Sequence, residues 1–346
     1  MPPVDGDAEM SLVRHAAPTL EMVAARAGVS RATVSRVVNG SDKVNPSSVK
    51  LVQAAIDELG YVPNRAARSL ASAQSHAIAL IVPEDVTRFF GDVFFASIVA
   101  GINARLEQTD YALNLMVATQ SEGAKTMRYL TGGAVDGAVV VSHHTADHFL
   151  ERIADTIPLV FGGRPGLAGI DTWVVDVDNE EGGAVAARRL VERGCKHIAT
   201  ITGPTDMQSA LERTDGWRRV LVDAGLEPGP EVDGDFSMMG GARAARRLLE
   251  TYPEMDGVFV ASDLMASGAM PVLLDAGKRV PEDVAIVGYD DSPAALACPV
   301  PLTTVRQPSE EMGRMMADIL IDVLAGNDDR PRSSIMPISL VERVSA

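Results

Sequence analysis

The sequence predicts a small all-α head followed by an α/β body of two doubly wound parallel-sheet lobes. Three short helical patterns fill the segment between residues 19 and 59. From Ala77 onward, short β-type runs alternate with amphipathic helical runs, the order produced by right-handed βαβ units and parallel sheets. Eight helical runs are many for one open sheet, and 346 residues have room for two to three domains. Two similar lobes are therefore expected.

Residues 1–17 precede the first helical pattern and are expected to be a disordered N-terminal extension. Their start is acidic and lacks the apolar segment of a signal peptide. No apolar run in the chain reaches the roughly 18–20 residues that a membrane helix needs. The two cysteines, Cys195 and Cys298, lie far apart in the sequence and suit a reducing compartment. A cytoplasmic location without membrane partners is predicted.

The head is expected to span residues 18–62, with helices over about 19–27, 30–38 and 46–59. Thr19, Ser30 and Asn45 are candidate N-caps, and Pro46 suits the first position of a helix. Gly28 allows a tight turn between the first two helices. Apolar residues at helical spacing predict a small core: Met22, Val23, Ala27, Val34, Val37, Val38, Val49, Val52, Ile56 and Leu59.

Charge is distributed unevenly along the chain. The net charge is −16, which by itself argues against binding to nucleic acid. Residues 14–70, however, contain eight Lys or Arg against four Asp or Glu, so this segment carries +4. A basic module on an acidic body is typical of a DNA-binding head whose body is repelled by phosphate.

Residues 63–74 are predicted to form a hinge helix or linker between head and body. The run PNRAARSLAS (63–72) is Ala-rich and begins with the start signal Pro63-Asn64. It is too short and too polar to be a stable isolated helix.

The body is expected to span residues 75–346. The N-lobe would comprise about 75–174 and 303–327, and the C-lobe about 175–302 and 328–346. Predicted strands are Ala77–Val82, Ala112–Val117, Gly137–Val141, Leu159–Phe161, Trp173–Val177, His197–Thr202, Val258–Ala261 and Ala285–Tyr289. Predicted helices are Phe94–Gln108, Glu122–Thr131, Ala146–Ala154, Asn179–Arg193, Ser209–Ala224, Ala242–Glu250, Leu264–Ala276 and Ser309–Leu324. Ligands of such sheets bind beyond the carboxyl ends of the strands, so two facing lobes predict a cleft.

The run TLEMVAARAGVSRATVSRVVNG (19–40) has the form of a helix-turn-helix. Small Ala24 lets the two helices approach closely. The second helix has a polar face opposite its valines: Ser30, Arg31, Ala32, Ser35 and Arg36. A short cationic helix with small residues at its N-terminus fits the major groove of DNA. A plain α-hairpin within a larger fold is the alternative interpretation.

The chain resembles the lactose/galactose repressor family of transcription regulators. The resemblance is carried by VAARAGVSRATVSRVVNG (23–40) and LGYVPNRAARSLAS (59–72). It continues in order through Phe94-Phe95, GP (203–204), RTDGW (213–217), SDLMASGAM (262–270), VGYDD (287–291) and PLTTVRQP (301–308). Each short motif is weak alone, but their ordered occurrence over residues 18–344 is specific. The body then resembles the family's effector domain, which is like periplasmic sugar-binding proteins.

The resemblance implies roles for residues of the head. Arg31 and Ala32 match the two positions that mostly select bases, where Arg bonds guanine bidentately and Ala touches at most a thymine methyl. Arg36 would be a further base contact. The other candidate DNA-binding residues of the head are Thr19 and the phosphate-contacting positions Ser30, Thr33, Ser35 and Asn39. For Thr33 and Ser35, ordinary helix surface is the alternative.

The resemblance also gives the hinge a role. In the family this segment orders only when two chains meet over the operator centre. Leu70 matches the residue that wedges into the minor groove and kinks the duplex, and Asn64, Ala67 and Arg68 would lie beside it. The alternative is a flexible linker with Leu70 packed on the body.

For the cleft, the resemblance implies a set of candidate effector-binding residues: Phe94, Phe95, Arg164, Arg213, Phe236, Asp263 and Asp290. The Asp263 carboxylate would bond a vicinal diol, and Arg213 would grip the ligand. At least one of Phe94 and Phe95 would pack on a sugar ring, with Phe236 as a second platform.

These cleft residues also have plainer interpretations. Asp263 has the position of a helix N-cap, and the two phenylalanines could belong to the core. Arg213 could form a surface ion pair with Asp215 or Glu212. Gly163 and Ser262 stand where the family often has an acidic residue and an Asn, so the identity of the effector stays open.

Other constellations indicate neither a metal nor catalysis. His143, His144 and His148 lack a third kind of ligand, so a surface loop is expected there. Asp176, Asp178 and Glu180 do not meet the spacing of a calcium loop, whereas Asp178 and Glu181 suit a capping box. No Ser/His/Asp arrangement stands out. No catalytic residue, metal or cofactor is expected, and the protein is not expected to be an enzyme.

Together these features predict a sequence-specific DNA-binding transcription regulator. The simplest form is a repressor controlled by a small molecule, expected to be a sugar, that binds in the cleft. The predicted partners are double-stranded pseudo-palindromic operator DNA and a second copy of the chain, with a tetramer left open. An activator or a co-repressor-dependent regulator fits the same residues. A solute-binding protein and a sugar-acting α/β enzyme are more distant alternatives.

Overall fold

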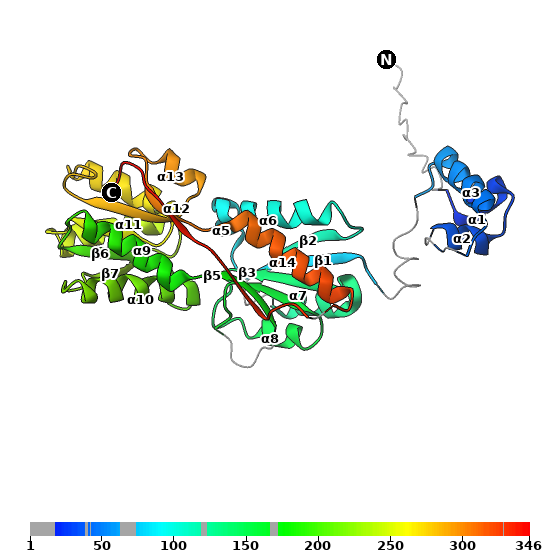
Figure 1. Ribbon diagram of the computed structural model, residues 1–346, viewed down its shortest axis with the longest axis horizontal. Coiled ribbons are helices and arrows are strands. Elements are labelled where there is room, and N and C mark those ends of the chain that lie inside the picture. Colours follow the sequence, from blue (N-terminus) through cyan, green and yellow to red (C-terminus); the bar gives the residue numbers. More distant parts are fainter. Residues whose placement is uncertain are drawn as a thin grey trace, which may run out of the picture. The chain divides into compact units, whose positions relative to one another are not determined.

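The computed structural model describes residues 18–38, 41, 43–62, 74–118, 123–166, 172–327 and 329–346. The chain divides into two compact units, Met1–Ser75 and His76–Ala346, whose elements are labelled in Figure 1. We call residues 18–62 the head and His76–Ala346 the body. The expected N-terminal extension (1–17) and residues 63–73 of the expected hinge lie outside the described residues.

The described residues of the head form three helices: α1 (Leu20–Ala27), α2 (Arg31–Val38) and α3 (Pro46–Leu59). Thr19 caps α1, because its Oγ1 accepts a hydrogen bond of 3.3 Å from the Met22 amide. Gly28 ends α1 at φ 66°, a left-handed conformation that favours glycine, and this places the tight turn before α2. Asn45 caps α3 by accepting from the Ser47 amide.

A small apolar core joins these helices. Its buried members are Val23, Ala24, Ala27, Val34, Val52, Ala55 and Tyr61. The expectation that Met22 and Val49 belong to this core is wrong, since their side chains are 47% and 37% exposed. The face of α1 that packs inward runs through Val23, Ala24 and Ala27, and Met22 lies about 100° away from Val23 around the helix.

The described residues of the body form two sheets of six strands each, in the orders β11-β5-β4-β3-β1-β2 and β12-β10-β9-β8-β6-β7. We call the part built on the first sheet the N-lobe and the part built on the second the C-lobe. The N-lobe strands are β1 (Ala77–Val82), β2 (Ala112–Val117), β3 (Gly137–Val141), β4 (Leu159–Gly162), β5 (Trp173–Val177) and β11 (Ser333–Met336). The C-lobe strands are β6 (Ile198–Thr202), β7 (Glu231–Asp233), β8 (Gly257–Val260), β9 (Ala285–Asp290), β10 (Thr303–Arg306) and β12 (Ser339–Val341). Within the described strands all pairings are parallel except that of β10 with β12.

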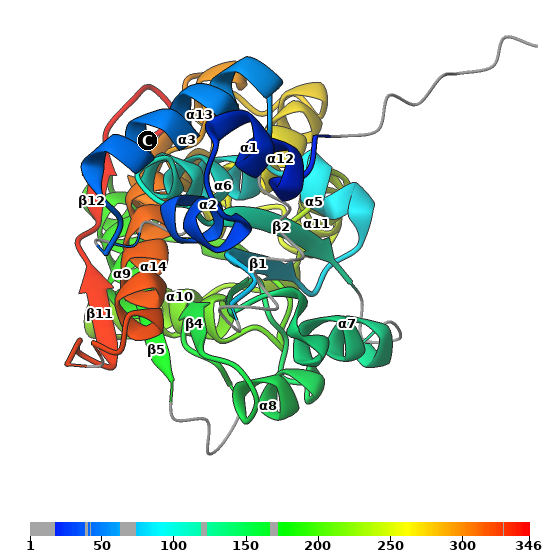
Figure 2. The ribbon, with the colours of Figure 1, turned by 90° about the vertical axis from the view of Figure 1, so that its right-hand side faces the viewer.

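Helices cover both faces of the N-lobe sheet. Alternate residues of β1 belong to different cores: Ile78 and Leu80 pack with α5, α6 and α14, whereas Ala79 and Ile81 pack with the α7–η2 segment and α8. Figure 2 shows α7 and α8 on the side of this sheet away from α6. The helix bounds are α5 (Val86–Gly91), α6 (Val93–Leu106), α7 (Gly123–Tyr129), η2 (Leu130–Ala134), α8 (Phe149–Ala154) and α14 (Ser309–Leu324). The N-lobe is therefore a doubly wound sheet.

The C-lobe is built in the same way. From β6 the chain runs through α10 to β7 at the edge of the sheet. It then returns through α11 to β8, on the other side of β6, and continues through α12 to β9. Because parallel connections are right-handed, these opposite steps put α10 and the α11–α12 pair on opposite faces. The helix bounds are α9 (Asn179–Glu192), α10 (Gln208–Asp223), α11 (Met238–Thr251), α12 (Asp263–Asp275) and α13 (Pro293–Ala297).

The predicted lobe boundaries differ from the observed sheets. β10 (Thr303–Arg306), expected in the N-lobe, pairs with β9 in the C-lobe, and β11 (Ser333–Met336), expected in the C-lobe, pairs with β5 in the N-lobe. β5 crosses the predicted boundary at residue 174 and belongs to the N-lobe. Hydrogen-bond pairing decides these assignments, and a sequence pattern does not show the pairing partner. The chain thus passes between the lobes three times, after β5, after β10 and between β11 and β12.

Glycines allow the paired helices of the body to touch closely. A Cβ on Gly101 of α6 would lie 1.8 Å from the Glu310 carbonyl oxygen of α14, and one on Gly313 of α14 would lie 2.3 Å from the Ile98 carbonyl oxygen. The α9–α10 crossing has the same reciprocal arrangement, with Gly183 facing the Arg213 carbonyl and Gly216 facing the Glu180 carbonyl. At these crossings the backbones of the two helices are in direct contact. Only residues without a side chain allow so short a distance between the helices.

Candidate functional site

In the head, the N-terminus of α2 carries the residues expected to meet DNA. Ser30 precedes α2, and its Oγ accepts a hydrogen bond of 3.2 Å from the Thr33 amide. The hydroxyl groups of Ser30 and Thr33 are also 2.9 Å apart and share a hydrogen bond. Ser30, Arg31 and Ala32 are exposed, and Thr33 and Ser35 are half-buried. The structure therefore presents a polar, accessible helix start.

Two arginines stand on this helix. The Nε of Arg31 forms an ion pair of 2.9 Å with Oε1 of Glu21, a residue of α1. Arg36 is exposed in the last turn of α2 and makes no ion pair with the residues that the structure describes. Thr19 is exposed as well, where it caps α1. The remaining predicted DNA-binding residues lie outside the described residues: Asn39, Asn64, Ala67, Arg68 and Leu70.

In the body, a cavity lies between the two lobes. Its volume is about 90 Å³, several times the roughly 10–15 Å³ that one water molecule needs. The lining residues are Arg88, Asp92, Phe94, Ser142, His143, Gly162, Gly163, Arg164, Asp176, Asn179, Met207, Gln208, Ser209, Arg213, Phe236, Ser262, Asp290, Gln307 and Met312. Several of them follow the carboxyl ends of β3, β4, β8 and β10, where ligands of open α/β sheets bind.

Arg213 of α10 lies at the C-lobe side of this cavity and is 6% exposed. Its Nε donates to Oδ1 of Asn179 at 2.9 Å, and its Nη1 donates to the Ala261 carbonyl oxygen at 2.7 Å. The guanidinium carbon lies 3.6 Å from the centre of the Tyr289 ring. The alternative of a surface ion pair with Asp215 or Glu212 is thereby wrong, because the side chain is buried and held on three sides.

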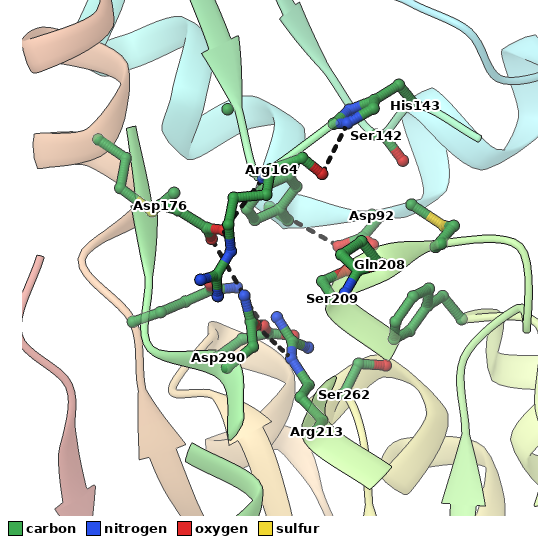
Figure 3. A pocket seen from close by; sticks show the side chains of 18 of the residues that line it. Asp92, Ser142, His143, Arg164, Asp176, Gln208, Ser209, Arg213, Ser262 and Asp290 are labelled. Atoms are coloured by element: carbon green, nitrogen blue, oxygen red, sulfur yellow. Dashed lines mark hydrogen bonds and ion pairs between the residues drawn. The ribbon is translucent and has the colours of Figure 1, made fainter. Parts of the chain in front are cut away.

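Two carboxyl groups of the lining are half-buried. Asp290, at the end of β9, accepts a hydrogen bond of 2.6 Å from Nε2 of Gln307. Burial raises the pKa of Asp290 well above its usual range, although the Arg213 charge opposes the shift. Asp92 caps α6 by accepting from the Phe94 amide at 3.0 Å, and burial raises its pKa as well. Figure 3 shows both carboxyl groups within the cavity lining. Carboxyl groups can accept hydrogen bonds from hydroxyl groups.

The backbone after β9 is strained. Asp290 has φ 111° and Asp291 has φ 54°, both in the region that side chains other than glycine rarely adopt. Residues held in such conformations cost about 1–3 kcal/mol each and gather at binding sites. Phe236, another lining residue, has φ 54°.

Arg164 connects the lobes at the edge of the cavity. Its amide donates to Oδ2 of Asp176 at 3.1 Å, and its Nη2 donates to Oε2 of Glu212 at 2.7 Å. Asp176 belongs to the N-lobe and Glu212 to the C-lobe, so the side chain bridges the two lobes. Figure 3 shows Arg164 beside Asp176.

Two further contacts bridge the lobes. Nη1 of Arg88 donates to the Asp235 carbonyl oxygen at 2.7 Å. The Nδ1 of His144 lies 2.9 Å from Oδ1 of Asp206. In all three bridges the cationic side chain comes from the N-lobe and the acceptor from the C-lobe.

The aromatic candidates fall into two groups. Phe94 and Phe236 line the cavity, whereas Phe95 is 1% exposed and packs in the N-lobe core. The core interpretation is therefore right for Phe95. Successive residues of α6 point about 100° apart, so only one of the pair can face the cavity.

Asp263 does not line the cavity and is 0% exposed. Its Oδ1 accepts from Oγ1 of Thr304 at 2.6 Å, and its Oδ2 accepts from the Ser292 amide at 2.8 Å. The N-cap interpretation is wrong too, because Ser262 caps α12 by accepting from the Met265 amide. Asp263 instead ties the start of α12 to the segments after β9 and within β10, and burial raises its pKa to about 7.

The histidine cluster is not simply a surface loop. His143 is 8% exposed and lines the cavity, with its Nε2 3.2 Å from the Arg164 carbonyl oxygen. Burial lowers the pKa of His143 to about 4, so its ring is neutral at pH 7. His148 is 71% exposed, as expected of a surface residue. Within the described part of the chain, no group of three His, Cys, Asp or Glu residues could hold a metal ion.

Sequence reasoning missed most of the polar lining. The residues not foreseen include Arg88, Asp92, Ser142, Asn179, Gln208 and Gln307. Ser142 and His143 follow directly after a buried strand, so the rule for the carboxyl ends of strands would have identified them. Arg88 lies on α5, and Asp92 caps α6. Neither this helix nor this cap was predicted from the sequence, so no pattern pointed to these two residues.

Two family models match parts of the chain. The family model described as "Bacterial regulatory proteins, lacI family" matches residues 19–64. A second model, the periplasmic binding protein-like domain, matches residues 187–346. Among the described residues, no helix combines the length and the apolar character that crossing a membrane requires.

Curated relatives extend over nearly the whole chain. The chain is 44% identical over 339 residues to the HTH-type transcriptional regulator CelR of Thermobifida fusca, covering 96% of this chain and 99% of CelR. It is 34% identical over 336 residues to the ribose operon repressor of Escherichia coli K12, covering 95% of this chain and 99% of that repressor.

Solved structures agree with these relatives. A complex of the transcriptional regulator CelR with cellobiose superposes with a TM-score of 0.75 at 43% identity, covering 95% of this chain and 100% of that one. A lac repressor dimer bound to operator and the anti-inducer ONPF superposes with a TM-score of 0.84 at 29% identity, covering 95% and 99%.

Proposed function

The chain belongs to the lacI family of bacterial regulatory proteins, and from this premise we propose a repressor that a sugar releases from its operator. It is a DNA-binding transcription regulator and not an enzyme. Two chains would bind one pseudo-palindromic operator, because symmetric half-sites match a two-fold dimer. The site of action is the cytoplasm, where the DNA lies.

One observation carries the ligand-controlled part of this proposal: the cavity is lined by charged side chains from both lobes. Asp92 comes from the N-lobe, whereas Asp290 and Arg213 come from the C-lobe. A ligand that binds to both sets has a different affinity for open and closed lobes. Such a difference is what a ligand needs to shift a conformational equilibrium.

The chemistry of the lining favours a sugar. Carboxylates, a guanidinium and side-chain amides bond hydroxyl groups in pairs, while Phe94 and Phe236 offer apolar surface to a ring. CelR, which is 43% identical, is the relative described in complex with cellobiose. We therefore propose cellobiose or a similar glucose disaccharide as the first effector to examine.

Among the predicted residues, we propose that the ligand contacts Phe94, Arg164, Arg213, Phe236 and Asp290. Phe95 and Asp263 are assigned supporting roles, since neither lines the cavity. Asp263 would act by holding the strained turn at Asp290 and Asp291 through the Ser292 amide.

On the DNA side, the proposal keeps the base contacts of Arg31, Ala32 and Arg36. Phosphate contacts are assigned to Thr19, Ser30, Thr33, Ser35 and Asn39. Asn64, Ala67, Arg68 and Leu70 would meet the central minor groove as two chains pair.

The test is fluorescence anisotropy of the full chain on a duplex from upstream of its own gene, at one fixed salt concentration, with a scrambled duplex as control. We expect preference for the upstream duplex and its loss on adding cellobiose. Ribose serves as the mismatched sugar. A thermal-shift series with the same sugars checks binding separately, because a ligand that binds the folded state raises its stability.

Three outcomes would contradict the proposal. Equal affinity for the upstream and the scrambled duplex would remove the operator function. An unchanged melting temperature with every sugar would remove the sugar effector. Tighter DNA binding with sugar would turn the repressor into a co-repressor-dependent regulator.

A further inference from the structure

The base-contacting arginine of the head is held by an acidic residue of the neighbouring helix. Glu21 occupies the first turn of α1, and Arg31 begins α2. Their ion pair of 2.9 Å spans the helix-turn-helix from one helix start to the other. Both side chains are largely exposed, at 73% for Arg31 and 62% for Glu21, so the pair lies on the accessible surface.

Glu21 lies where a negative charge is stabilised. It lies at the N-terminus of a helix, where the unpaired amides and the helix dipole favour a negative charge. The pKa of Glu21 lies below its usual range, first because its own backbone amide bonds the carboxylate, then because of the Thr19 hydroxyl and the Arg31 charge. The carboxylate is therefore a stable anion opposite Arg31.

The nitrogen of Arg31 that pairs with Glu21 determines which N–H donors of Arg31 remain free. A guanidinium carries five N–H donors in a planar fork. The ion pair uses Nε, which leaves the two terminal nitrogens, Nη1 and Nη2, at the outer end of the side chain. Two donors side by side match the O6 and N7 acceptors of guanine in the major groove.

We propose that Glu21 is a specificity-determining residue, which holds Arg31 so that its Nη1–Nη2 end meets a guanine. Without Glu21, the long side chain moves freely and reaches neighbouring bases and phosphates, which lowers the penalty for a wrong base. This inference rests on the proposed DNA function, in which Arg31 reads a base.

A carboxylate near DNA also repels phosphate, so Glu21 lowers affinity for every sequence. Holding Arg31 raises the discrimination between bases, whereas repelling phosphate only lowers affinity. The two effects differ in one respect: repulsion acts equally on all sequences, whereas holding Arg31 acts at one base pair.

The test separates these effects in the full-length chain. A duplex library with a randomised central segment is bound and sequenced with the wild type and with Arg31→Ala. The base pair whose preference disappears in Arg31→Ala is the one that Arg31 reads. Anisotropy then gives the affinity ratio between the preferred and a substituted base at that pair, for wild type, Glu21→Ala and Glu21→Gln.

We expect Glu21→Ala to lower this ratio by roughly two- to fivefold, the range that an exposed ion pair supports. Glu21→Gln should lie between Glu21→Ala and wild type, because the amide still accepts a hydrogen bond from Nε. In the Arg31→Ala background, Glu21→Ala should leave the ratio unchanged. A ratio measured within one variant is insensitive to partial unfolding, because the inactive fraction cancels.

Asp57→Asn is the matched control, since it removes the same charge from an exposed position of α3, where the carboxylate binds Gln53. It should change affinity uniformly and leave the ratio intact. If Glu21→Ala has the same affinity ratio between the preferred and the substituted base as the wild type, the inference is wrong, but the proposed DNA function is unaffected. A wild-type chain without any sequence preference would overturn both.

Discussion

At the scale of single residues, Arg213 both stabilises the C-lobe through its hydrogen bonds and lines the cavity. Two of its donors are used, by Asn179 and by the Ala261 carbonyl, and its flat face covers Tyr289. The guanidinium also lines the cavity together with the half-buried Asp290. Lysine keeps the charge but cannot reproduce the planar fork.

We therefore expect Arg213→Lys to weaken sugar binding by at least tenfold, since hydrogen bonds to charged groups contribute about 1.5–3 kcal/mol. DNA binding without sugar should persist. Calorimetric titration with cellobiose measures the first effect and anisotropy the second. Arg219→Lys is the control, because Arg219 lies on the same helix and pairs with Glu180 at the exposed surface. Equal sugar affinity in both variants would exclude Arg213 from the site.

We expect His144 to make the stability of the body depend on pH. Its ring is hydrogen-bonded to Glu84 and Asp206, and these carboxylates raise its pKa to about 9, against the effect of burial. Asp147 also faces it, through the His144 amide. A group whose pKa is raised on folding stabilises the fold below its unfolded pKa, here 6.5. That contribution is lost as the pH rises through about 9.

The expected result is a wild-type advantage over His144→Gln, on the order of 1–3 kcal/mol in free energy of unfolding at pH 6. The advantage should shrink between pH 6.5 and 10. Urea unfolding of both proteins at several pH values measures it. His148→Gln is the control, as His148 is 71% exposed. An advantage that is independent of pH would show that the His144 charge does not contribute.

The residues of the site were partly predictable from the sequence. Motif resemblance pointed to Arg213, Phe236 and Asp290, and all three line the cavity. It also pointed to Asp263, which instead faces Ser292 and Thr304 inside the C-lobe. A motif places a residue near a strand end, but whether its side chain turns toward solvent or core depends on neighbours distant in sequence.

At the scale of elements, the glycine crossings determine how closely helices pack. We expect Gly313→Ala in α14 to destabilise the body by about 1–3 kcal/mol, because its Cβ would overlap the Ile98 carbonyl and force the helices apart. Thermal unfolding measures the loss. Gly91→Ala is the control, since a Cβ there meets nothing within 4 Å. Equal melting temperatures for the two variants would contradict this account of the crossing.

Elements with strong periodicity were predictable to within a few residues. The strand Ala77–Val82 and the helix Ser309–Leu324 match their predictions, because a buried strand and an amphipathic helix have distinct patterns. α11 begins at Met238, four residues before its prediction, because Ser237 caps it through the Gly240 amide. The three-residue strands β7 and β12 were not predicted, since so short a segment has no period.

At the scale of the whole body, the bridges between the lobes are polar, and in each of them the cationic side chain comes from the same lobe. Arg88, His144 and Arg164 belong to the N-lobe, and their acceptors belong to the C-lobe. These contacts favour closed lobes before any sugar arrives. A ligand that requires closure then binds more tightly, because the competent state is already populated.

Glu212→Gln removes the charge that Arg164 meets and should shift the lobes toward an open arrangement. We expect sugar affinity to fall by roughly two- to fivefold, as for other accessible ion pairs, and the radius of gyration of the sugar-free protein to rise in X-ray scattering. Glu231→Gln is the control, because its partner Arg218 belongs to the same lobe. If both variants scatter alike, the bridge does not hold the lobes together.

The three passages of the chain between the lobes also have a consequence for the gene. Residues 77–177 and 333–336 build one sheet, and residues 198–306 and 339–341 build the other, so no continuous run of codons encodes either lobe. A recombination breakpoint between codons 178 and 332 joins β5 of one parent to β11 of another. The head, by contrast, is one continuous run. A single splice can therefore exchange the operator preference, whereas a new ligand preference has to be inherited with the entire body.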